Sequence, residues 1–524
     1  MKIQKQPPSI FNDVIGPVMR GPSSSHCAGS LRIGRMIRNL MNGRIGDVLA
    51  EYDPNGSLVT THESQGSDMG LCGGLLGYDT SDERLLNYRD EIQKAGIAVR
   101  VEYVSYGATH PNTYRITAVG GKITHRVTAL SVGGGMIELV EIDGAVVNMR
   151  GDRWETVVFL SEAAGNPVRD ISSLVQAGEV TLKKGHTPFV LISTTSPLSA
   201  SVLDKIENLP PVTRVAVIDP VLPIISHPEV KLPFTNSGEM IRFNRNRGLP
   251  LWKLAAAYES ARGQISETAA VEKMLEIVRI CDAAIQTGLK GTKFADRILP
   301  AQSPRFEKKM TAGRLIADPV LNRIILYVSA LMETKSAMGV IVAAPTAGAC
   351  GALPGAIIGA GQALRRTEEE MARAMLAAGL IGVFIAGQST FAAESAGCQA
   401  ECGSASGMAA AGLVQLHGGD FRQALGAASL ALQNSFGMTC DPIANRVEAP
   451  CLGKNIMAAA NALACANMAL ADYDPLIPLD EVLAAFDKVG RSLPRELRCT
   501  ALGGLSVTKT SKRINRRLLR RKRA

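Results

Sequence analysis

The stretch GCQAECGSASGMAAA (397–411) leads into a helical pattern at residues 405–417, and it consists almost entirely of small residues. The whole chain is also rich in small residues and poor in aromatic ones, with 51 glycines and 4% aromatic residues. We therefore expect a core in which helices lie close together. Other helical patterns occur at residues 251–262, 266–287, 319–333, 368–385, 420–434, 454–471 and 479–489. Because strand signals stop after Gly248, residues 251–508 are predicted to form an all-α domain.

Residues 1–148 show a different pattern, in which short β-type runs alternate with amphipathic helical stretches. The runs lie at 101–104, 114–119 and 127–132, and the helical stretches at 31–41 and 82–95. This mixture predicts an α+β domain. Glycine and small polar residues gather at 21–26, 56–66 and 133–135, where we expect loops that carry chemistry.

A third pattern occupies residues 152–220. Apolar runs at 156–160, near 180–182, at 189–193 and at 212–218 alternate with helical stretches at 167–175 and 200–209. This βαββαβ order is typical of a small ligand-binding or regulatory module. Prolines then mark a linker at 221–250, so the 524 residues are predicted to form a multidomain protein.

The formal net charge of +9 is concentrated at the end of the chain. Residues 509–524 contain nine Lys or Arg and no acid, and the 57 basic residues less these nine equal the 48 acids. We therefore expect a neutral body with a solvated basic tail that has local affinity for anions and no specific nucleic-acid partner. A dedicated nucleic-acid or membrane role for the tail is the alternative.

Ten cysteines and a start without an apolar signal region predict a cytoplasmic protein whose thiols are not paired in disulfides. Two uncharged stretches, 336–364 and 374–393, are long enough to span a membrane. Prolines interrupt the first stretch, polar residues interrupt the second, and neither has an aromatic belt. We therefore expect buried helices and no membrane partner.

Three cysteines, Cys398, Cys440 and Cys451, each lie beside Gly or Pro at a junction between a loop and a helix. Backbone N–H groups at helix starts favour the thiolate, which is the form that binds iron or zinc. Zinc sites usually use close cysteine pairs, which Cys398 and Cys402 offer, whereas scattered cysteines suit an iron–sulfur cluster with one open, Lewis-acidic iron. The plainer alternative is that these cysteines are small core residues.

Six segments, in the same order, resemble those of the bacterial iron–sulfur L-serine dehydratases in the form that fuses β-type and α-type parts. They are GPSSSHCAGSLRIG (21–34), HPNT (110–113), SVGGG (131–135), APTAGACGALPGA (344–356), GCQAECGSASGMAAA (397–411) and CDPIANRVEAPC (440–451). The resemblance implies a lyase of amino-acid degradation that converts L-serine to pyruvate and ammonia without pyridoxal phosphate. It also implies a 4Fe-4S cluster held by Cys398, Cys440 and Cys451, and residues 152–220 are similar to an ACT domain.

The GPSSSH turn offers three hydroxyls, from Ser23, Ser24 and Ser25, and a titratable nitrogen, from His26. These groups can cradle a substrate carboxylate, or they can simply cap the helix that begins nearby. The resemblance favours substrate binding by these four residues and by Asn112 of HPNT.

One departure from the family concerns the catalytic base. The family carries a histidine in a turn that reads THESQGSDMG in this chain, and Gln65 stands in its place. Glutamine cannot accept the α-proton, so we expect His62 to be the base, with His26 as a second catalytic residue and His110 as a further candidate.

Other departures concern the substrate and the end of the chain. The segment GQSTFAAESAGC (387–398) differs before the first cysteine, and the basic tail has no cysteine. The alternatives are therefore a related hydro-lyase or desulfidase for another small α-amino or α-hydroxy acid, or a cluster-containing sensor without catalysis. We expect the other cysteines, including Cys350 and Cys499, to be structural, and the protein to be a homodimer.

Overall fold

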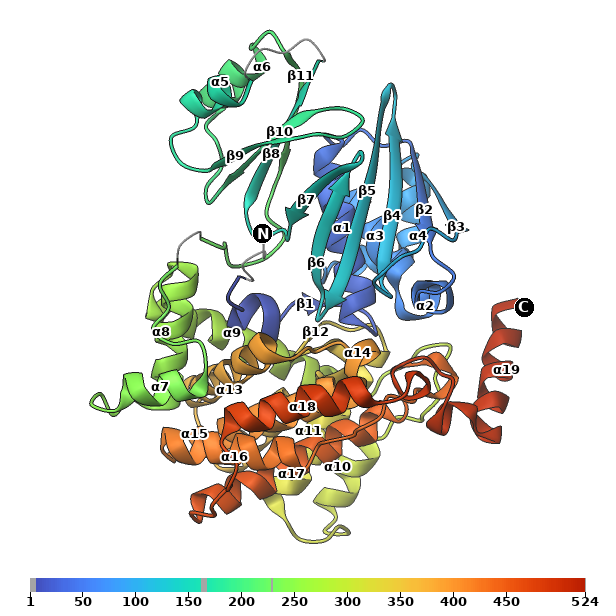
Figure 1. The fold of residues 1–524 in the computed structure, drawn as a ribbon. Coiled ribbons are helices and arrows are strands. Elements are labelled where there is room, and N and C mark those ends of the chain that lie inside the picture. The colour runs from blue at the N-terminus through green and yellow to red at the C-terminus, as the bar shows by residue number, and fades with distance from the viewer. Residues whose placement is uncertain (1–5, 162–166, 228–229, 524) are drawn as a thin grey trace. The chain divides into compact units, whose positions relative to one another are not determined.

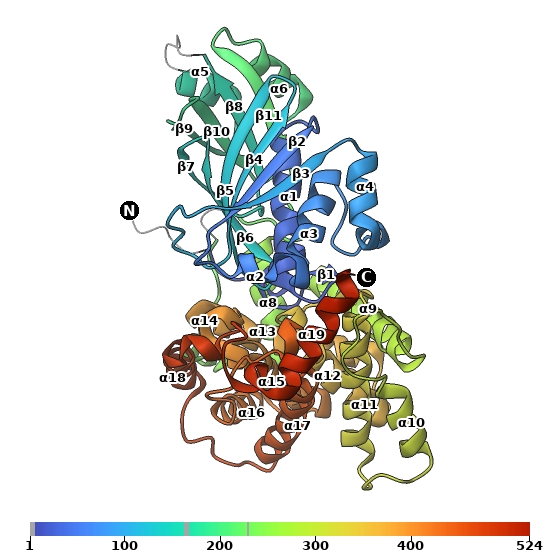
Figure 2. The same ribbon diagram turned by 90° about the vertical axis from the view of Figure 1, so that its right-hand side faces the viewer.

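The computed structural model describes residues 6–161, 167–227 and 230–523, and it divides into two compact units. One unit comprises residues 25–228, and the other comprises residues 1–24 together with 229–524. Figures 1 and 2 show that the first is rich in strands and the second in helices. The predicted mixture of a sheet-containing N-terminal region and a helical C-terminal region is confirmed at this level. Residues 1–5, 162–166, 228–229 and 524 of the predicted domain ranges lie outside the described residues.

A six-stranded sheet forms the larger part of the first unit, in the order β3-β2-β4-β5-β6-β7. The β2–β3 pair is parallel and the other neighbours are antiparallel. Burial alternates along β5, and helices α1, α3 and α4 lie over one face of the sheet (Figure 2). The bounds are β2 Asp47–Tyr52, β3 Ala98–Tyr103, β4 Thr113–Gly120, β5 Ile123–Gly133, β6 Met136–Ile142, β7 Ala145–Met149, α1 Gly29–Leu40, α3 Ser67–Leu76 and α4 Tyr88–Lys94.

The prediction of a loop at 56–66 is wrong, because most of this segment is helical. Helix α2 runs from Leu58 to Gln65 and α3 follows after a single residue, Gly66. Gly66 has φ 93°, a left-handed conformation that only glycine adopts readily, so it ends one helix and starts the next in a new direction. His62 therefore lies in the last turn of a helix.

A four-stranded antiparallel sheet completes this unit, in the order β11-β8-β10-β9. The elements follow one another along the chain in the predicted βαββαβ order. They are β8 Trp154–Leu160, α5 Pro167–Leu174, β9 Glu179–Lys183, β10 Phe189–Thr194, α6 Ala200–Glu207 and β11 Val212–Ile218. Buried apolar side chains from β8, β10 and β11 pack against α5 and α6.

The second unit is built from helices that approach closely through small residues. In α15, a Cβ added at Gly412 would lie 3.0 Å from the carbonyl oxygen of Ala374 in α13. The bounds are α7 Ser237–Asn244, α8 Leu251–Gly263, α9 Glu267–Leu289, α10 Ser303–Thr311, α11 Pro319–Ser336, α12 Ala352–Ala363, α13 Glu368–Gln388, α14 Ala393–Cys398, α15 Ser404–His417, α16 Phe421–Gln433, α17 Cys451–Leu470, α18 Leu479–Ser492 and α19 Lys509–Arg523. Helix α7 lies within the predicted linker, and α19 occupies the predicted solvated tail.

Helix α13 is long and apolar enough to cross a membrane by length and composition. However, 78% of its apolar window is buried inside the protein, as in the core helix of a globular unit. One helix of this kind is weak evidence for a membrane span.

Residues 6–24, which we call the N-terminal arm, pack with the helical unit. Glu259 of α8 accepts hydrogen bonds from Ser9 Oγ (2.5 Å) and from the N–H of Ile10 (2.7 Å). Farther along the arm, β1 (Val18–Met19) pairs with β12 (Ile341–Val342). This two-residue ladder corrects the expectation that no strand follows Gly248; it is too short to leave an alternating pattern in the sequence.

Glu155 of β8 is buried, and burial raises its pKa to about 7. The raised pKa means that the folded unit disfavours the ionised carboxylate, so stability is lost as the pH rises from about 4.5, the ordinary value, to about 7. We predict that Glu155→Gln raises the free energy of unfolding of this unit by about 2–3 kcal/mol at pH 8 and changes it little near pH 4, measured by urea denaturation.

The control is Glu207→Gln at an exposed position of α6, which should change stability by less than about 0.5 kcal/mol at either pH. A Glu155→Gln protein that is less stable than the wild type at pH 8 would contradict the pH argument.

Candidate metal centre and active-site residues

The three predicted cysteine ligands are all buried, and each is placed by a turn or a helix end. Cys398 ends α14 after a kink at Gly397, which has φ 68°. Cys440 lies in an extended segment whose N–H donates to Leu497 O (2.8 Å), and Cys451 is the first residue of α17. Segments far apart in the sequence thus carry the three thiols into one unit.

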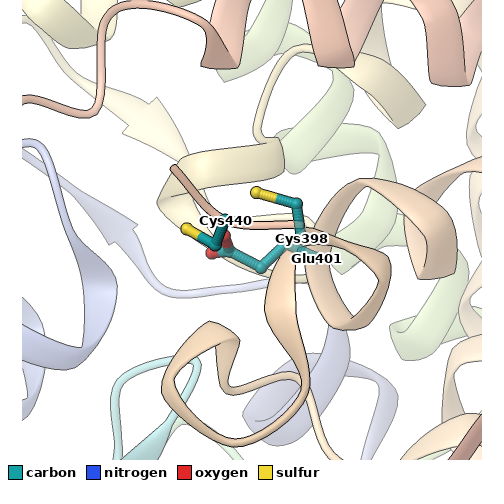
Figure 3. Close-up of side chains that lie close together, drawn as sticks. All are labelled: Cys398, Glu401 and Cys440. Carbon is teal, nitrogen blue, oxygen red and sulfur yellow. The ribbon is translucent and has the colours of Figure 1, made fainter. Parts of the chain in front are cut away.

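Two of these thiols converge with a carboxylate. The sulfurs of Cys398 and Cys440 and an oxygen of Glu401 all lie within 4.8 Å of one another. Figure 3 shows the Glu401 carboxylate beside the Cys440 side chain, with the Cys398 sulfur close by. Cys451 is not one of these three residues, but charge on Cys398 and on Glu401 acts on its thiol. The donor set can bind a metal ion.

Glu401 was not predicted as a site residue. It follows Cys398 by three positions and lies in a helical turn, Gln399–Gly403, so both side chains leave the same side of the turn. Thr346 Oγ1 donates to its carboxylate at 2.6 Å, and burial raises its pKa to about 7. A Cβ added at Gly348 would lie 2.7 Å from Glu401 Oε1, so glycine leaves the room that the carboxylate fills.

Two lysines bring positive charge to the cysteine site. Lys335 of α11 is fully buried and donates to Val447 O. Lys454 of α17 donates to Asp441 Oδ1 at 2.6 Å. Burial lowers the pKa of Lys454, but the charges of Cys398 and Asp441 outweigh burial and raise it. Cations in these places offset the negative charge of thiolate ligands.

The surroundings of Cys440 and Cys451 favour the thiol, whereas the turn and helix-start positions of these residues led us to expect the thiolate. Hydrogen bonds to Cys398 and Cys499, followed by burial, raise the pKa of Cys440. Burial raises the pKa of Cys451 as well. The helix start at Cys451 does not offset its loss of hydration, so a metal has to displace the thiol protons.

Cys499, which we expected to be structural, lies at the cysteine site. Its N–H donates to Cys440 O (3.1 Å), and its thiol hydrogen-bonds with the Cys440 thiol. The surrounding sequence RELRCTALGG contains no spacing pattern that joins it to the other cysteines. Only the pairing of the segments around 440 and 498 brings the two thiols together.

In the sheet-containing unit, a chain of hydrogen bonds joins His26 to Asn112. His26 Nε2 lies 2.9 Å from Thr61 Oγ1, and Thr61 Oγ1 donates to Ser57 O at 2.7 Å. Ser57 Oγ in turn donates to Asn112 Oδ1. His26 is buried, and burial, followed by the charge of His62, lowers its pKa to about 4. His26 is therefore neutral at pH 7.

Ser131 of SVGGG ties the serine turn to the HPNT segment. Its Oγ donates to Ser25 O (2.8 Å), and its N–H donates to Asn112 O (3.0 Å). The structure thus brings three of the predicted substrate-binding residues, Ser25, His26 and Asn112, into one connected group.

Ser24 belongs to the helical unit, where it contacts the segment next to the cysteine site. Its Oγ accepts a hydrogen bond from the N–H of Ala347 (3.3 Å). Ala347 begins the short turn that contains Gly348, between Thr346 and the next helix. Ser23, the first serine of the turn, is half-buried.

His62 is held from both sides. Its Nδ1 lies 2.8 Å from Asp68 Oδ1, and its Nε2 lies 2.8 Å from the Tyr103 hydroxyl. An imidazole held by a carboxylate at one nitrogen presents the other nitrogen as an acceptor. Asp68 was not predicted as a site residue, and only the bend at Gly66 brings it back to His62. Gln65 is buried beside these residues.

Comparison with known proteins identifies the family to which this chain belongs. The family model described as serine dehydratase alpha chain matches residues 246–506. The "Probable L-serine dehydratase, alpha chain" of Bacillus subtilis (strain 168) is 33% identical over 285 residues, 54% of this chain and 95% of the relative. The "L-serine dehydratase, alpha chain" of Peptoniphilus asaccharolyticus is 34% identical over 283 residues, 54% of this chain and 97% of the relative.

An L-serine dehydratase of Escherichia coli (strain K12) is 32% identical over 286 residues, 53% of this chain and 62% of the relative. These matches define the protein as an enzyme of the lyase class. The chain belongs to the serine dehydratase alpha-chain family, so the resemblance drawn from its six segments is confirmed at the level of the family.

The close approach of Gly348 to Glu401 gives a test of the site's packing. We predict that Gly348→Ala costs about 1–3 kcal/mol of stability, because the new Cβ forces the carboxylate from Thr346. Combining it with Glu401→Ala should restore about 1 kcal/mol relative to the sum of the single changes, measured by urea denaturation. Gly387→Ala, which meets nothing within 4 Å, is the control. Additive effects of the two changes would show that the contact does not exist.

Proposed function

We propose that the protein dehydrates and deaminates L-serine to pyruvate and ammonia with a 4Fe-4S cluster held by Cys398, Cys440 and Cys451. The observation that carries the proposal is the convergence of two buried cysteines, Cys398 and Cys440, in a chain of the serine dehydratase alpha-chain family. Relatives named L-serine dehydratase support the substrate and the dehydration step.

The residues present fit such a cluster. Soft sulfur donors suit iron–sulfur chemistry, and three of them leave one iron without a protein thiolate. Lys335 and Lys454 offset negative charge around the sulfurs. When bound, the cluster supplies a Lewis acid that makes a β-hydroxyl a better leaving group.

The chain supplies the base for the α-proton, and we assign this role to His62. The Asp68 carboxylate accepts a hydrogen bond from Nδ1–H, which leaves Nε2 as the acceptor nitrogen and orients the ring. The Tyr103 hydroxyl occupies Nε2 and has to give way to a substrate. His26 is a weaker candidate, because a pKa of about 4 makes it a poor proton acceptor.

We assign binding of the substrate's charged groups to Ser23, Ser24, Ser25, His26 and Asn112. The Ser131 hydrogen bonds to Ser25 and Asn112 support a preformed arrangement of backbone and side-chain donors. Neutral His26 adds a hydrogen-bonding group without a charge.

The functional parts that we propose are a β-type substrate-binding part (1–148), an ACT-like regulatory part (152–220), a linker (221–250), a cluster-binding part (251–508) and a basic end (509–524). The βαββαβ order supports the ACT-like assignment. We further propose a cytoplasmic homodimer whose product, pyruvate, can enter gluconeogenesis.

The cluster assignment is tested by anaerobic reconstitution with iron and sulfide. Wild-type protein should bind about four irons, turn brown and release ammonia from L-serine, and Cys440→Ser should lose most of its iron and absorbance, because a cubane needs each thiolate ligand. The control is Cys281→Ser, a buried cysteine in α9.

A colourless and fully active wild type, or one zinc per chain, would refute the cluster. The same preparation distinguishes the substrates. Turnover of L-threonine, L-cysteine or D-serine in place of L-serine would favour a related hydro-lyase or desulfidase, and no turnover of any of them would favour a sensor.

The base assignment is tested separately. We predict that His62→Gln lowers kcat by about 10²–10⁴-fold, since a general base contributes roughly that factor. Loss of the base should also abolish exchange of the substrate α-proton with deuterated water, followed by NMR. Asp68→Asn should give a smaller loss of both, because it disorients the imidazole without removing it.

The control is His417→Gln at the exposed end of α15, which should leave both readouts unchanged. Normal exchange in the His62→Gln protein would assign the base to another residue.

A further inference from the structure

The C-terminal helix α19 presents a dense row of exposed cations. Its described side chains include six exposed basic residues: Lys509, Lys512, Arg513, Arg516, Arg517 and Arg520. No acidic residue follows Glu496 in the chain. Among the residues that the structure describes, no ion pair involves α19. Figure 1 shows α19 at the edge of the helical unit.

The opposite face of α19 is anchored. Ser511 and Leu518 are buried, at 1% and 5% exposure, and the half-buried Ile514 lies between them on the same face. Ser511 Oγ accepts a hydrogen bond from the N–H of Ala444 (3.2 Å), and Arg517 reaches Arg297 O (3.5 Å). Ser511, Ile514 and Leu518 therefore attach α19 to its unit, and the six basic residues remain exposed to solvent.

An ordered helix with this charge pattern is costly without a partner. Lys509 and Arg513, Lys512 and Arg516, and Arg516 and Arg520 are like-charge pairs four positions apart. Each pair destabilises a helix by about 0.2–0.5 kcal/mol, and basic residues in the first turn oppose the helix dipole. A dense array of negative charge beside α19 would attract these basic residues and so outweigh both their mutual repulsion and their unfavourable interaction with the helix dipole.

The residue types on the exposed face of α19 indicate which kind of polyanion it binds. A membrane-surface helix inserts a continuous apolar face, but the described part of α19 offers only one exposed apolar side chain, Leu519 (53%), because Leu518 is buried and Ile514 half-buried in its own unit. Base stacking needs aromatic side chains, and α19 has none. Arg and Lys without such groups contact phosphates and do not read sequence.

We propose that α19 binds the phosphate backbone of nucleic acids without sequence preference. The assignment goes beyond the proposed lyase function and does not depend on it.

The experiment measures binding of the full-length protein to a fluorescein-labelled 20-base-pair duplex by anisotropy, between 50 and 200 mM KCl. Six phosphate contacts predict a slope of log K against log salt of about −5. The triple change Arg513→Gln, Arg516→Gln and Arg520→Gln should reduce the slope to roughly half that value and weaken binding at least about tenfold at 50 mM KCl.

The matched control removes the same charge from α10 by Arg305→Gln, Lys308→Gln and Lys309→Gln, which are exposed residues of the same unit. It should bind as the wild type does. Equal weakening by the two triple variants, or no wild-type binding at 50 mM KCl, would overturn the proposal. Binding to phosphatidylserine–phosphatidylcholine vesicles but not to the duplex would also overturn it, in favour of a membrane surface.

Discussion

The hydrogen bond from Thr346 to Glu401 is the constraint on which the cysteine site depends. It joins two segments that lie 55 residues apart, and it holds a partly buried acidic side chain beside two buried thiols. A carboxylate is expensive to bury without a partner, so the hydroxyl and the nearby lysines are what permit it to stay there. The glycine at 348 is the steric counterpart of this bond, since a larger residue would occupy the position of the carboxylate.

Regular elements with strong periodicity were predictable. Strand β11 runs over residues 212–218, as the apolar run indicated, and the helices around 251–489 begin and end within a few residues of their patterns. The elements that were missed have short or ambiguous signals. Helix α2 is a polar segment that ends at glycine, and β1 and β12 have two residues each. Local sequence does not contain the tertiary contacts that stabilise such elements.

The sequence motifs led us to expect a convergence of cysteines, and the structure brings Cys398 and Cys440 together. Cys398, Cys440 and Cys451 stand beside turn residues, and the serine turn and HPNT are compact segments. Glu401, Asp68 and Cys499 escaped prediction for a physical reason. Each acquires its place through a bend, a turn or a pairing of remote segments, and each belongs to a residue type that is common elsewhere in the chain.

The division into two units has an experimental consequence. The chain has two tryptophans, and they fall on opposite sides of the division, with Trp154 in β8 and Trp252 in α8. Intrinsic emission from each indole therefore reports the loss of structure in a different part of the chain. Replacing either tryptophan with phenylalanine would leave one fluorescent indole in the protein. The unfolding of the unit that contains it could then be followed by fluorescence without a signal from the other unit.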